Sequence, residues 1–452
     1  MTATPAVATA GAPPADKGVV ERLLAPIADV RAGEAASALL LMATMFLLLA
    51  GYYLLKTARE VFILNDGGAE IKSYSSAGQA LLLLVLVPAY GAFASRVNRM
   101  QLVQWVTLFF AGNLLLFLAA LSAGLRIGIV YFLWVGIFNV MVIAQFWALA
   151  ADLYTEQQGK RLFPLIGVGS SLGAWVGSVR AGSLVGTAGP SRLLLGGAVI
   201  LVVCVVLARL AERATRRDAR AEKPAHEKLA GGPGGFRMIA TDRYLMLIGF
   251  LVLLLNVVNT SGEYVFGRYV VSLATERFGA GPEGEAARQQ LIGEIYSGYF
   301  SYINLLGFLL QLFVVSRVFK LLGVARSLFI HPMIALVSYL LMLRAPSFEA
   351  IRAVKIVDNA VAYSLSNTAM QALWLPTSRE SKYKAKQVVD SFCVRAGDVL
   401  QAAIVYAGEL TALTVGGFAA LNIVFTFAWL GVAFGLRGRL QARALESGRA
   451  EL

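Results

Sequence analysis

Three ionisable residues lie close together inside an apolar stretch near the start of the chain, in YYLLKTAREVFILNDGGAE (residues 52–70). Lys56, Arg59 and Glu60 are spaced i, i+3 and i+4, so a helix would place all three on one face. A guanidinium offers a planar fork, and an ammonium a point charge, to a phosphate or a carboxylate. This face is therefore a candidate binding site for an organic anion.

Ionisable residues also interrupt other apolar runs of the chain, at Asp152, Glu263, Lys355, Asp358, Asp390, Arg395 and Asp398. A charge at the centre of a bilayer costs about 2.5–3.5 kcal/mol on insertion scales, so such a residue is expected to face a cavity or a partner. Glu263 stands in NVVNTSGEYVFGRYV, where its polar neighbours are Asn256, Asn259, Thr260 and Ser261. This density of hydrogen-bonding groups favours a water-filled cavity over close packing.

Each of these charges also has a purely structural interpretation. Lys56 and Arg59 could lie at the outer end of a span and reach the interface with their head groups. Two pairs of opposite charge are spaced three residues apart and could be self-neutralising ion pairs: Lys355 with Asp358, and Arg395 with Asp398. Lys386 and Asp390 could be charges at a helix terminus near the cytoplasmic end. For Lys355 and Asp358, a structural ion pair is the preferred interpretation.

The elements that must position these residues are membrane-spanning helices. The 452 residues are 58% hydrophobic and 15% charged, with a mean hydropathy of +0.68. Soluble domains are roughly 45–50% apolar and about 25% charged. The composition and the repeated runs of about 20 apolar residues predict an all-α membrane protein. About twelve spans are expected, near 37–63, 76–96, 101–123, 127–153, 161–183, 193–211, 243–268, 293–316, 321–343, 350–374, 386–409 and 414–436.

These spans divide into two six-helix halves, 37–211 and 243–436, joined by a basic linker rich in Gly and Pro at 212–242. A weak internal repeat supports the division, since ALAADLYTEQQGKRLFPLIGVGSSLG and WLPTSRESKYKAKQVVDSFCVRAG share one layout half a chain length apart. Two parallel repeats around a midplane site are the architecture of the major facilitator transporters. Residues 1–36 are expected to be a disordered or interfacial tail, and 437–452 a second tail.

The net charge of +13 reflects topology. Most of the 40 Lys and Arg residues fall in the loops that share a side with the linker, which predicts that both termini are cytoplasmic. The charge is thus explained by the bilayer and does not indicate a nucleic-acid polymer as partner. We expect a multi-pass protein of a bacterial inner membrane, with monomer as the default state for this architecture.

Glycine spacing and the absence of motifs exclude several classes of function. Gly169, Gly173 and Gly177 recur every fourth residue, which favours close helix packing. A dinucleotide fingerprint would need a preceding strand. The chain has no Walker A, HExxH or GxSxG sequence, and its two cysteines and two histidines are too scattered for a metal centre. We therefore expect no enzyme activity, no ATP-hydrolysing pump, no cofactor and no metal.

Three stretches together carry a family resemblance: YYLLKTAREVFILNDGGAE, QFWALAADLYTEQQGKRLFPLIG and LWLPTSRESKYKAKQVVDSFCVRAGDVLQ. They resemble the first helix, the fourth helix with its following turn, and the tenth-to-eleventh helix segment of the ADP/ATP translocase (nucleotide transporter) family of plastids and intracellular bacteria. With the twelve-span layout, the resemblance covers nearly the whole chain after residue 37. It implies a secondary transporter that exchanges ATP for ADP or imports nucleotides.

The resemblance also implies roles for particular residues of this chain. Substrate binding is expected at Lys56, Arg59, Glu60, Asp152, Glu263 and Arg395. Stacking on a base is considered for Tyr53, Trp147 and Trp374, with packing as the alternative, and gating for Lys160, Lys386 and Asp390. In the empty state, Asp152 and Glu263 would gate or pair with the cations.

The chain departs from the family in the tenth helix, where Thr-Lys-Glu is replaced by Ala369-Met370-Gln371. A cation that would meet a phosphate is therefore missing at Met370, although Lys355 or Arg395 could compensate. Two alternatives to nucleotide exchange stay open. One is a transporter of another organic anion, and the other is a non-transporting membrane sensor or assembly protein, in which the charges are internal salt bridges.

Overall fold

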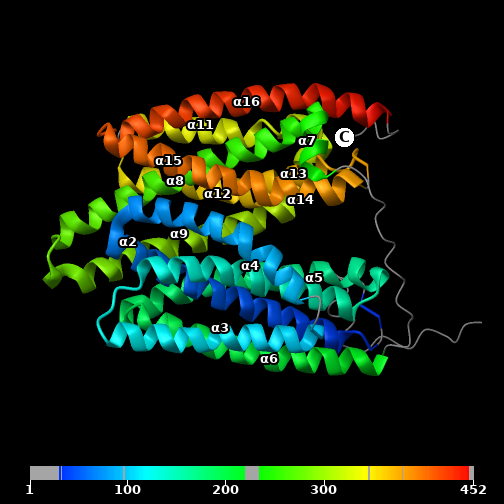
Figure 1. Cartoon of the computed structure of the whole chain (residues 1–452), viewed down its shortest axis with the longest axis horizontal. Coiled ribbons are helices and arrows are strands. Elements are labelled where there is room, and N and C mark those ends of the chain that lie inside the picture. Colours follow the sequence, from blue (N-terminus) through cyan, green and yellow to red (C-terminus); the bar gives the residue numbers. More distant parts are fainter. Residues whose placement is uncertain are drawn as a thin grey trace, which may run out of the picture.

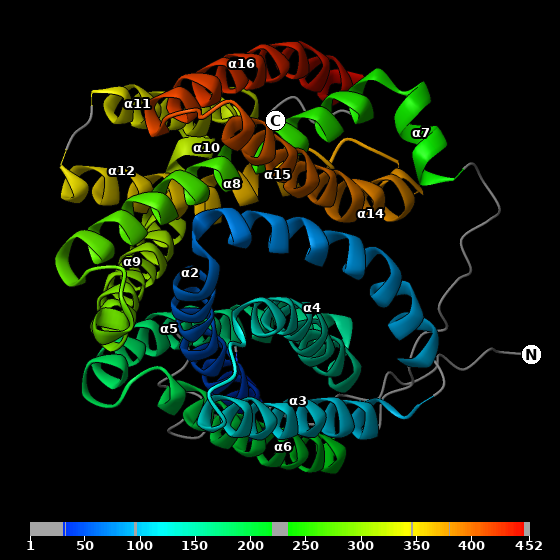
Figure 2. The same ribbon diagram turned by 60° about the vertical axis from the view of Figure 1, so that its left-hand side comes forward.

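Two bundles of helices lie side by side in the computed structural model, which describes residues 30–446 except 32, 95–96, 219–233, 345–346 and 379 (Figure 1). Helices α2 to α6 form one bundle, here the N-bundle, and α8 to α16 form the other, here the C-bundle (Figure 2). The described residues contain no strand. The expected all-α fold with two halves is confirmed.

The helices of the N-bundle follow the predicted spans closely. They are α2 (Ala35–Ala94), α3 (Arg99–Ser122), α4 (Gly128–Leu153), α5 (Glu156–Ala188) and α6 (Ser191–Asp218). The first two predicted spans are the two arms of α2, which bends at Gly68. Gly68 has φ 70° and ψ −169°, a conformation that only glycine adopts readily, so a residue without a Cβ is required at the bend.

The C-bundle is more interrupted. Its helices are α8 (Arg243–Phe278), α9 (Glu285–Phe313), α10 (Val315–Ser327), α11 (Ile330–Leu343), α12 (Phe348–Val361), α13 (Asn367–Ala372), α14 (Lys386–Val388), α15 (Val394–Leu410) and α16 (Val415–Glu446). A 3₁₀ turn at Pro282–Gly284 precedes α9. Wider π-helical turns occupy Ala362–Ser366, Ser381–Ala385 and Val389–Cys393. The predicted spans 350–374 and 386–409 are thus built from several pieces.

By length and composition, seven described helices could cross a membrane, or eight if the bent pair Pro282–Phe313 and Val315–Ser327 is one span. This number is below the twelve expected because both arms of α2 count as one helix. The ninth to eleventh predicted spans are divided by bends and π-turns into helices shorter than a bilayer is thick.

The glycine stripe of α5 packs as predicted. A Cβ atom at Gly169 would lie 2.6 Å from the carbonyl oxygen of Met42, and one at Gly173 would lie 2.1 Å from that of Phe46. Gly177 approaches the carbonyl oxygen of Ala50 in the same way, at 2.4 Å. The backbones of α5 and α2 therefore touch along two turns, which fixes the first arm of α2 in the bundle.

The flanks differ in part from the predicted boundaries. Helix α6 continues to Asp218, and a short helix, α7 (Gly235–Thr241), lies where the linker was expected. Helix α16 continues to Glu446, so most of the predicted second tail is helical. These extensions are rich in Ala, Glu and Arg, which are good helix formers. Most of the first tail lies outside the described residues, and the domain boundaries stay a prediction.

Between described residues, the polar contacts that join the two bundles lie at one end and in the middle of the molecule. We call the end with Gly68, Phe278 and Leu410 the kink end, and the end with Ala35 and Glu446 the tail end. Near the kink end, Arg268 of α8 lies 3.5 Å from Glu70 of α2, and Asn65 donates a hydrogen bond to Glu285 at 2.9 Å. In the middle, Asn304 donates to Ser178 at 3.1 Å. Between pairs of described residues, no hydrogen bond or ion pair crosses from one bundle to the other towards the tail end.

Candidate functional site

A cavity of about 180 Å³ lies between the two bundles, beside the middle of α2. Its walls come from α2, α4, α8, α9, α12, α15 and the π-turn after α12. The charged side chains that line it are Lys56, Arg59, Glu60, Lys72 and Glu263. Sequence patterning predicted four of these five residues as site residues, and the structure brings those four together with Lys72.

Glu60 is shared by two cations of α2. Its side chain is 1% exposed; one carboxylate oxygen pairs with Arg59 and the other lies 2.6 Å from the Nζ of Lys72. The bend at Gly68 makes the second contact possible, because the second arm of α2 returns past the first and carries Lys72 back to Glu60. Arg59 also stacks on Phe132 of α4, 4.7 Å from the ring centroid.

Lys56 has no carboxylate partner among the described residues. Its ammonium lies over two aromatic rings instead, 4.2 Å from the centroid of Phe300 and 5.2 Å from that of Tyr53. Cation–π contacts stabilise an ammonium without neutralising it. The donors of Lys56 are therefore available to an anion in the cavity.

Glu263 faces the cation cluster from the C-bundle but does not pair with it. Its Oε1 accepts hydrogen bonds from the hydroxyl of Tyr299 at 2.6 Å and from the amide of Asn359 at 2.9 Å. Asn359 also donates to the hydroxyl of Tyr299 and to the carbonyl of Lys355. The expected pairing of Glu263 with a cation of α2 is absent within 4 Å in this structure. Its carboxylate is held instead by neutral donors on α9 and α12.

With ordinary charge states, the cavity carries a net positive charge. Its three cations are Lys56, Arg59 and Lys72, and its two carboxylates are Glu60 and Glu263, which leaves 3 − 2 = +1. An uncompensated charge inside a membrane protein is costly, so the site favours a ligand that brings negative charge.

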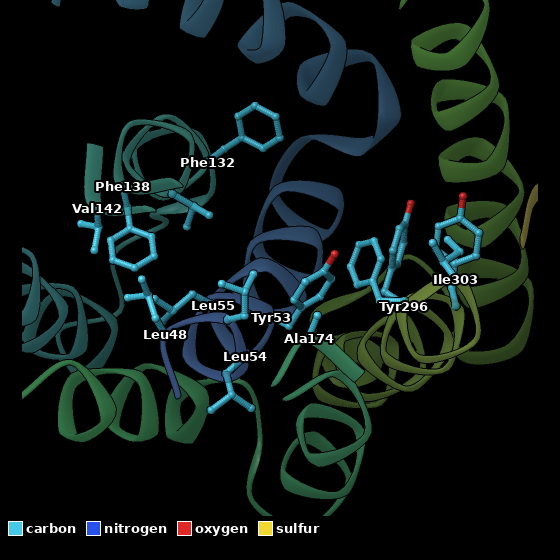
Figure 3. Packing of buried hydrophobic residues seen from close by; sticks show 14 of the residues in the cluster. Leu48, Tyr53, Leu54, Leu55, Phe132, Phe138, Val142, Ala174, Tyr296 and Ile303 are labelled. Carbon is cyan, nitrogen blue, oxygen red and sulfur yellow. The ribbon is translucent and has the colours of Figure 1, made fainter. Parts of the chain in front are cut away.

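The three aromatic residues considered for stacking do not line this cavity. Tyr53 is buried where α2 meets α9 (Figure 3). Its ring lies edge-on to that of Phe300, with the centroids 5.8 Å apart. Trp147 packs edge-on against Phe163 of α5, and Trp374 is buried at the end of the segment after α13. All three side chains therefore pack against other parts of the protein, which was the alternative to stacking on a base. The aromatic rings that line the cavity are those of Phe132, Tyr264, Tyr299, Phe300 and Tyr363.

The other predicted site residues lie away from the cavity. Asp152 forms an exposed ion pair with Arg99 at 3.0 Å, near the tail end of α4. Arg395 pairs with Asp398 at 3.3 Å, and Lys386 lies 3.6 Å from Asp390. The geometry therefore gives none of these residues contact with a ligand in the cavity. The side chain of Lys160 lies outside the described residues.

Both predicted ion pairs with a spacing of three residues are formed in the C-bundle. Asp398 of the Arg395 pair also accepts a hydrogen bond from Asn256 at 2.8 Å. The predicted pair of Lys355 and Asp358 is confirmed at 2.8 Å, fully inside the C-bundle.

Among the described residues, no group of three or more His, Cys, Asp or Glu side chains is placed to hold a metal ion.

Sequence patterning missed Lys72, Tyr299 and Asn359. Lys72 follows the glycine pair 67–68, which is typical of a turn. The pair does not indicate the direction of the bend, so the contact of Lys72 with Glu60 could not be predicted from it. Tyr299 and Asn359 stand in helices with no local charge pattern around them, and only the packing of α8, α9 and α12 brings them to Glu263. For Lys72 the signal present in the sequence was the Gly-Gly break itself.

Charged pairs also tie helices together at the tail end. Burial alone would raise the pKa of the Glu34 carboxyl, but hydrogen bonds from Arg161, the backbone of Arg31 and Gln158 outweigh burial and lower it. Similarly, Arg443 of α16 and the backbone of Tyr244 lower the pKa of Asp242 against the effect of burial. Each pair lies within one bundle, so each holds a bundle together without joining the two.

No family model matches the chain, and no curated protein sequence matches it significantly. Solved structures match over most of their length. A bacterial homologue of the iron transporter ferroportin in an inward-facing state has a TM-score of 0.59 and 15% identity, covering 87% of this chain and 98% of that one. The nucleoside transporter NupG has a TM-score of 0.59 and 14% identity, covering 90% and 98%. A POT family transporter in complex with 5-aminolevulinic acid has a TM-score of 0.61 and 14% identity, covering 88% and 96%.

These identities are too low to transfer a substrate, so the likeness shows the fold alone. The expected major facilitator-like arrangement of helices is confirmed by this likeness to solved membrane transporters.

Proposed function

We propose that this protein is a secondary transporter that moves an organic anion, a nucleotide, by exchange. The observation that carries the proposal is the unpaired ammonium of Lys56 beside Arg59, in a cavity with a net positive charge between the bundles. A phosphate group entering this cavity would supply the missing negative charge and accept hydrogen bonds from both side chains.

The nucleotide is supported by the resemblance of the first, fourth and tenth-to-eleventh helix segments to the ADP/ATP translocase family. Further support comes from the cavity itself. The rings of Phe132 and Tyr363 could stack on a base, and Glu263 has a second carboxylate oxygen that could accept a hydrogen bond from a hydroxyl or an amino group. The site thus offers cations on α2 and an acceptor on α8.

Alternating access is supported by the distribution of contacts between the bundles. The bundles are joined by polar contacts at the kink end and in the middle but not towards the tail end among the described residues. A rocking motion that breaks the kink-end contacts would expose the cavity to the other side. In the proposed topology, the tail end is the cytoplasmic face of a bacterial inner membrane.

The proposal is tested with purified protein in liposomes, by following uptake of labelled nucleotide. We expect Arg59→Ala to abolish uptake while the protein still inserts, because the side chain that meets a phosphate is gone. Lys56→Gln should reduce uptake at least tenfold. Lys320→Gln is the matched control, because Lys320 is exposed on α10, outside the cavity. Uptake that persists in Arg59→Ala would contradict the assignment.

A second candidate is transport of a smaller organic anion. Two observations favour it: the cavity of about 180 Å³ is smaller than the roughly 300–1,000 Å³ typical of small-molecule sites, and Met370 stands where the family has a cation. Met370 packs against the apolar core of the protein and does not line the cavity. A competition panel separates the candidates: if excess ATP and ADP fail to displace the transported substrate, this second function holds.

A further inference from the structure

The C-bundle buries a second charged cluster, which the proposed binding site does not use. Asp358 of α12 lies between two basic side chains. Its Oδ2 is 2.8 Å from the Nζ of Lys355, and its Oδ1 is 3.2 Å from the Nε2 of His331 on α11. The Nδ1 of His331 lies 2.7 Å from the hydroxyl of Ser366. Lys355 is 0% exposed, and Asp358 and His331 are each 3% exposed.

The surroundings of His331 fit both of its protonation states. In the neutral ring, Nε2–H donates to the Asp358 carboxylate, and the Ser366 hydroxyl donates to Nδ1. In the protonated ring, Nδ1–H donates to the same hydroxyl oxygen after the Ser366 proton turns away. The imidazole can therefore gain or lose a proton without the movement of a heavy atom.

The charge of the cluster is closely balanced. Lys355 and Asp358 cancel, so the cluster is neutral when His331 is neutral and carries +1 when His331 is protonated. Among the described residues, Asp358 is the one carboxylate in contact with the imidazole, and it is already shared with Lys355. The protonated state is therefore incompletely compensated. A nearby negative charge would stabilise it.

Two structural connections run from this cluster to the cavity. Neighbouring residues of α12 face the two sites: Asp358 contacts His331, while Asn359 donates a hydrogen bond to Glu263. The π-helical turn Ala362–Ser366 does the same, since Tyr363 lines the cavity and Ser366 contacts His331. Single π-turns occur frequently at functional sites.

We propose that His331 is a proton-binding site whose occupancy is coupled to the occupancy of the cavity. An anion in the cavity would favour the protonated imidazole, and a proton on His331 would favour the bound anion by the same factor, because such coupling is reciprocal. Proton binding at His331 stands on its own geometry, whereas coupling to a nucleotide rests on the proposed function.

The groups around the imidazole come from four neighbouring elements and from α11 itself. Asp358 of α12 contacts the ring and pairs with Lys355, and the next residue, Asn359, donates a hydrogen bond to Glu263 of α8. Tyr339 of α11 lies with Lys355 beside Gly262. The π-turn contributes Ser366 and α16 contributes Trp429, neither of which titrates in the accessible range. No described basic residue of α10 forms an ion pair or hydrogen bond with the ring.

Trp429 provides a direct readout of His331, because its ring lies edge-on to the imidazole with the centroids 4.9 Å apart. A protonated imidazole quenches indole fluorescence more strongly than a neutral one. We therefore expect a stepwise loss of tryptophan fluorescence on acidification of the purified protein. The step should be absent in His331→Gln and in Trp429→Phe, which removes the reporter but keeps the histidine.

His226→Gln is the matched control, because His226 is the only other histidine of the chain, and it should leave the step unchanged. Each variant is first checked for its helical content and its elution volume. If the fluorescence titration curves of the wild type, His331→Gln and Trp429→Phe are the same, proton binding at His331 is overturned.

Coupling is tested by repeating the titration under two conditions. Glu263→Gln, which removes negative charge from the cavity without naming a substrate, should move the step to lower pH. Saturating ADP should move it to higher pH. An unmoved step in Glu263→Gln overturns the coupling. A step that moves in Glu263→Gln but not with ADP, while ADP also fails to compete in transport, supports the coupling and counts against the nucleotide instead.

Discussion

At the scale of single residues, the site depends on which charges are paired. Glu60 forms ion pairs with both Arg59 and Lys72. Of the three cations that line the cavity, Lys56 is therefore the one whose hydrogen-bond donors are open. Glu263 is bound by Tyr299 and Asn359, so its charge acts on the cavity without cancelling a particular cation. The electrostatic preference for an anion therefore rests on one net positive charge, which three cations and two carboxylates leave in the cavity.

Neutralising Glu263 should strengthen anion binding. The Glu263→Gln variant keeps a carbonyl oxygen for Tyr299 and Asn359, so the hydrogen bonds that position it are preserved. Removing one negative charge from the cavity should tighten binding of a nucleotide by roughly tenfold, about 1–2 kcal/mol at an effective dielectric near 20. The measurement is displacement of labelled nucleotide in detergent. Weaker binding would show that a hydrogen bond from the ligand to the second oxygen of Glu263 outweighs the repulsion between its charge and the anion.

The Glu34 carboxyl should make stability depend on pH. Its pKa is lowered in the folded protein, so the stabilisation from Arg161 is complete above the ordinary pKa of a glutamate and is lost as the pH falls through the lowered value. We expect Glu34→Gln to cost about 1–2 kcal/mol at neutral pH and much less in acid. Thermal unfolding of both proteins at several pH values measures this. An equal cost at every pH would contradict the ion pair.

At the scale of elements, two features of α2 set the position of the site. The contact with the glycines of α5 fixes its first arm, and the bend at Gly68 returns its second arm so that Lys72 meets Glu60. The cation cluster therefore belongs to one helix, while the hydrogen-bonding wall with Glu263, Tyr299 and Asn359 belongs to the opposite bundle.

Gly173→Ala should destabilise the N-bundle. The added Cβ would lie 2.1 Å from the carbonyl oxygen of Phe46, so α5 and α2 would have to separate. Overpacking of this kind costs typically about 1–3 kcal/mol. Gly167→Ala on the same helix is the control, because nothing lies within 4 Å of its added Cβ. Thermal unfolding in detergent compares the two. Equal melting temperatures would exclude the close approach of the backbones.

The elements were largely predictable from the sequence, and the site was predictable only in part. Hydropathy located α3, α4 and α5 within a few residues, and four-residue spacing indicated the packing face with Gly173. Local spacing also identified Lys56, Arg59 and Glu60, because they share a helix face. The contact of Lys72 with Glu60 depends on how sharply α2 bends at Gly68, and that of Asn359 with Glu263 depends on packing between helices, so neither hydropathy nor local spacing predicted them.

At the scale of the whole molecule, the two bundles close on a charged cavity from the kink end. Near the kink end, Arg268 lies between Glu70 of the N-bundle and Glu409 of its own bundle, at 3.5 and 3.2 Å. Tyr264 donates its hydroxyl proton to one of these two carboxylates, which both lie within hydrogen-bond distance. This group is the principal charged contact across the bundles among the described residues.

Removing the charge of Arg268 should shift the population towards a state open at the kink end. In Arg268→Gln, the carboxylates of Glu70 and Glu409 lose their common cation, so the closed state loses stabilisation and the open state does not. Distances between spin labels placed on the two bundles at the kink end would report the shift. Arg277→Gln, an exposed residue near the same end of α8, serves as control. Unchanged distances in Arg268→Gln would remove this contact from the closing mechanism.

We propose that the protein binds a nucleotide in the cavity and moves it across the membrane in exchange for another. The most direct measurement follows the entry of labelled ATP into liposomes that contain the purified protein and are loaded with unlabelled ADP, with empty liposomes beside them. We predict rapid entry that depends on internal ADP and is lost in Arg59→Ala. Equal entry into loaded and empty liposomes, or none into either with folded and inserted protein, would contradict nucleotide exchange.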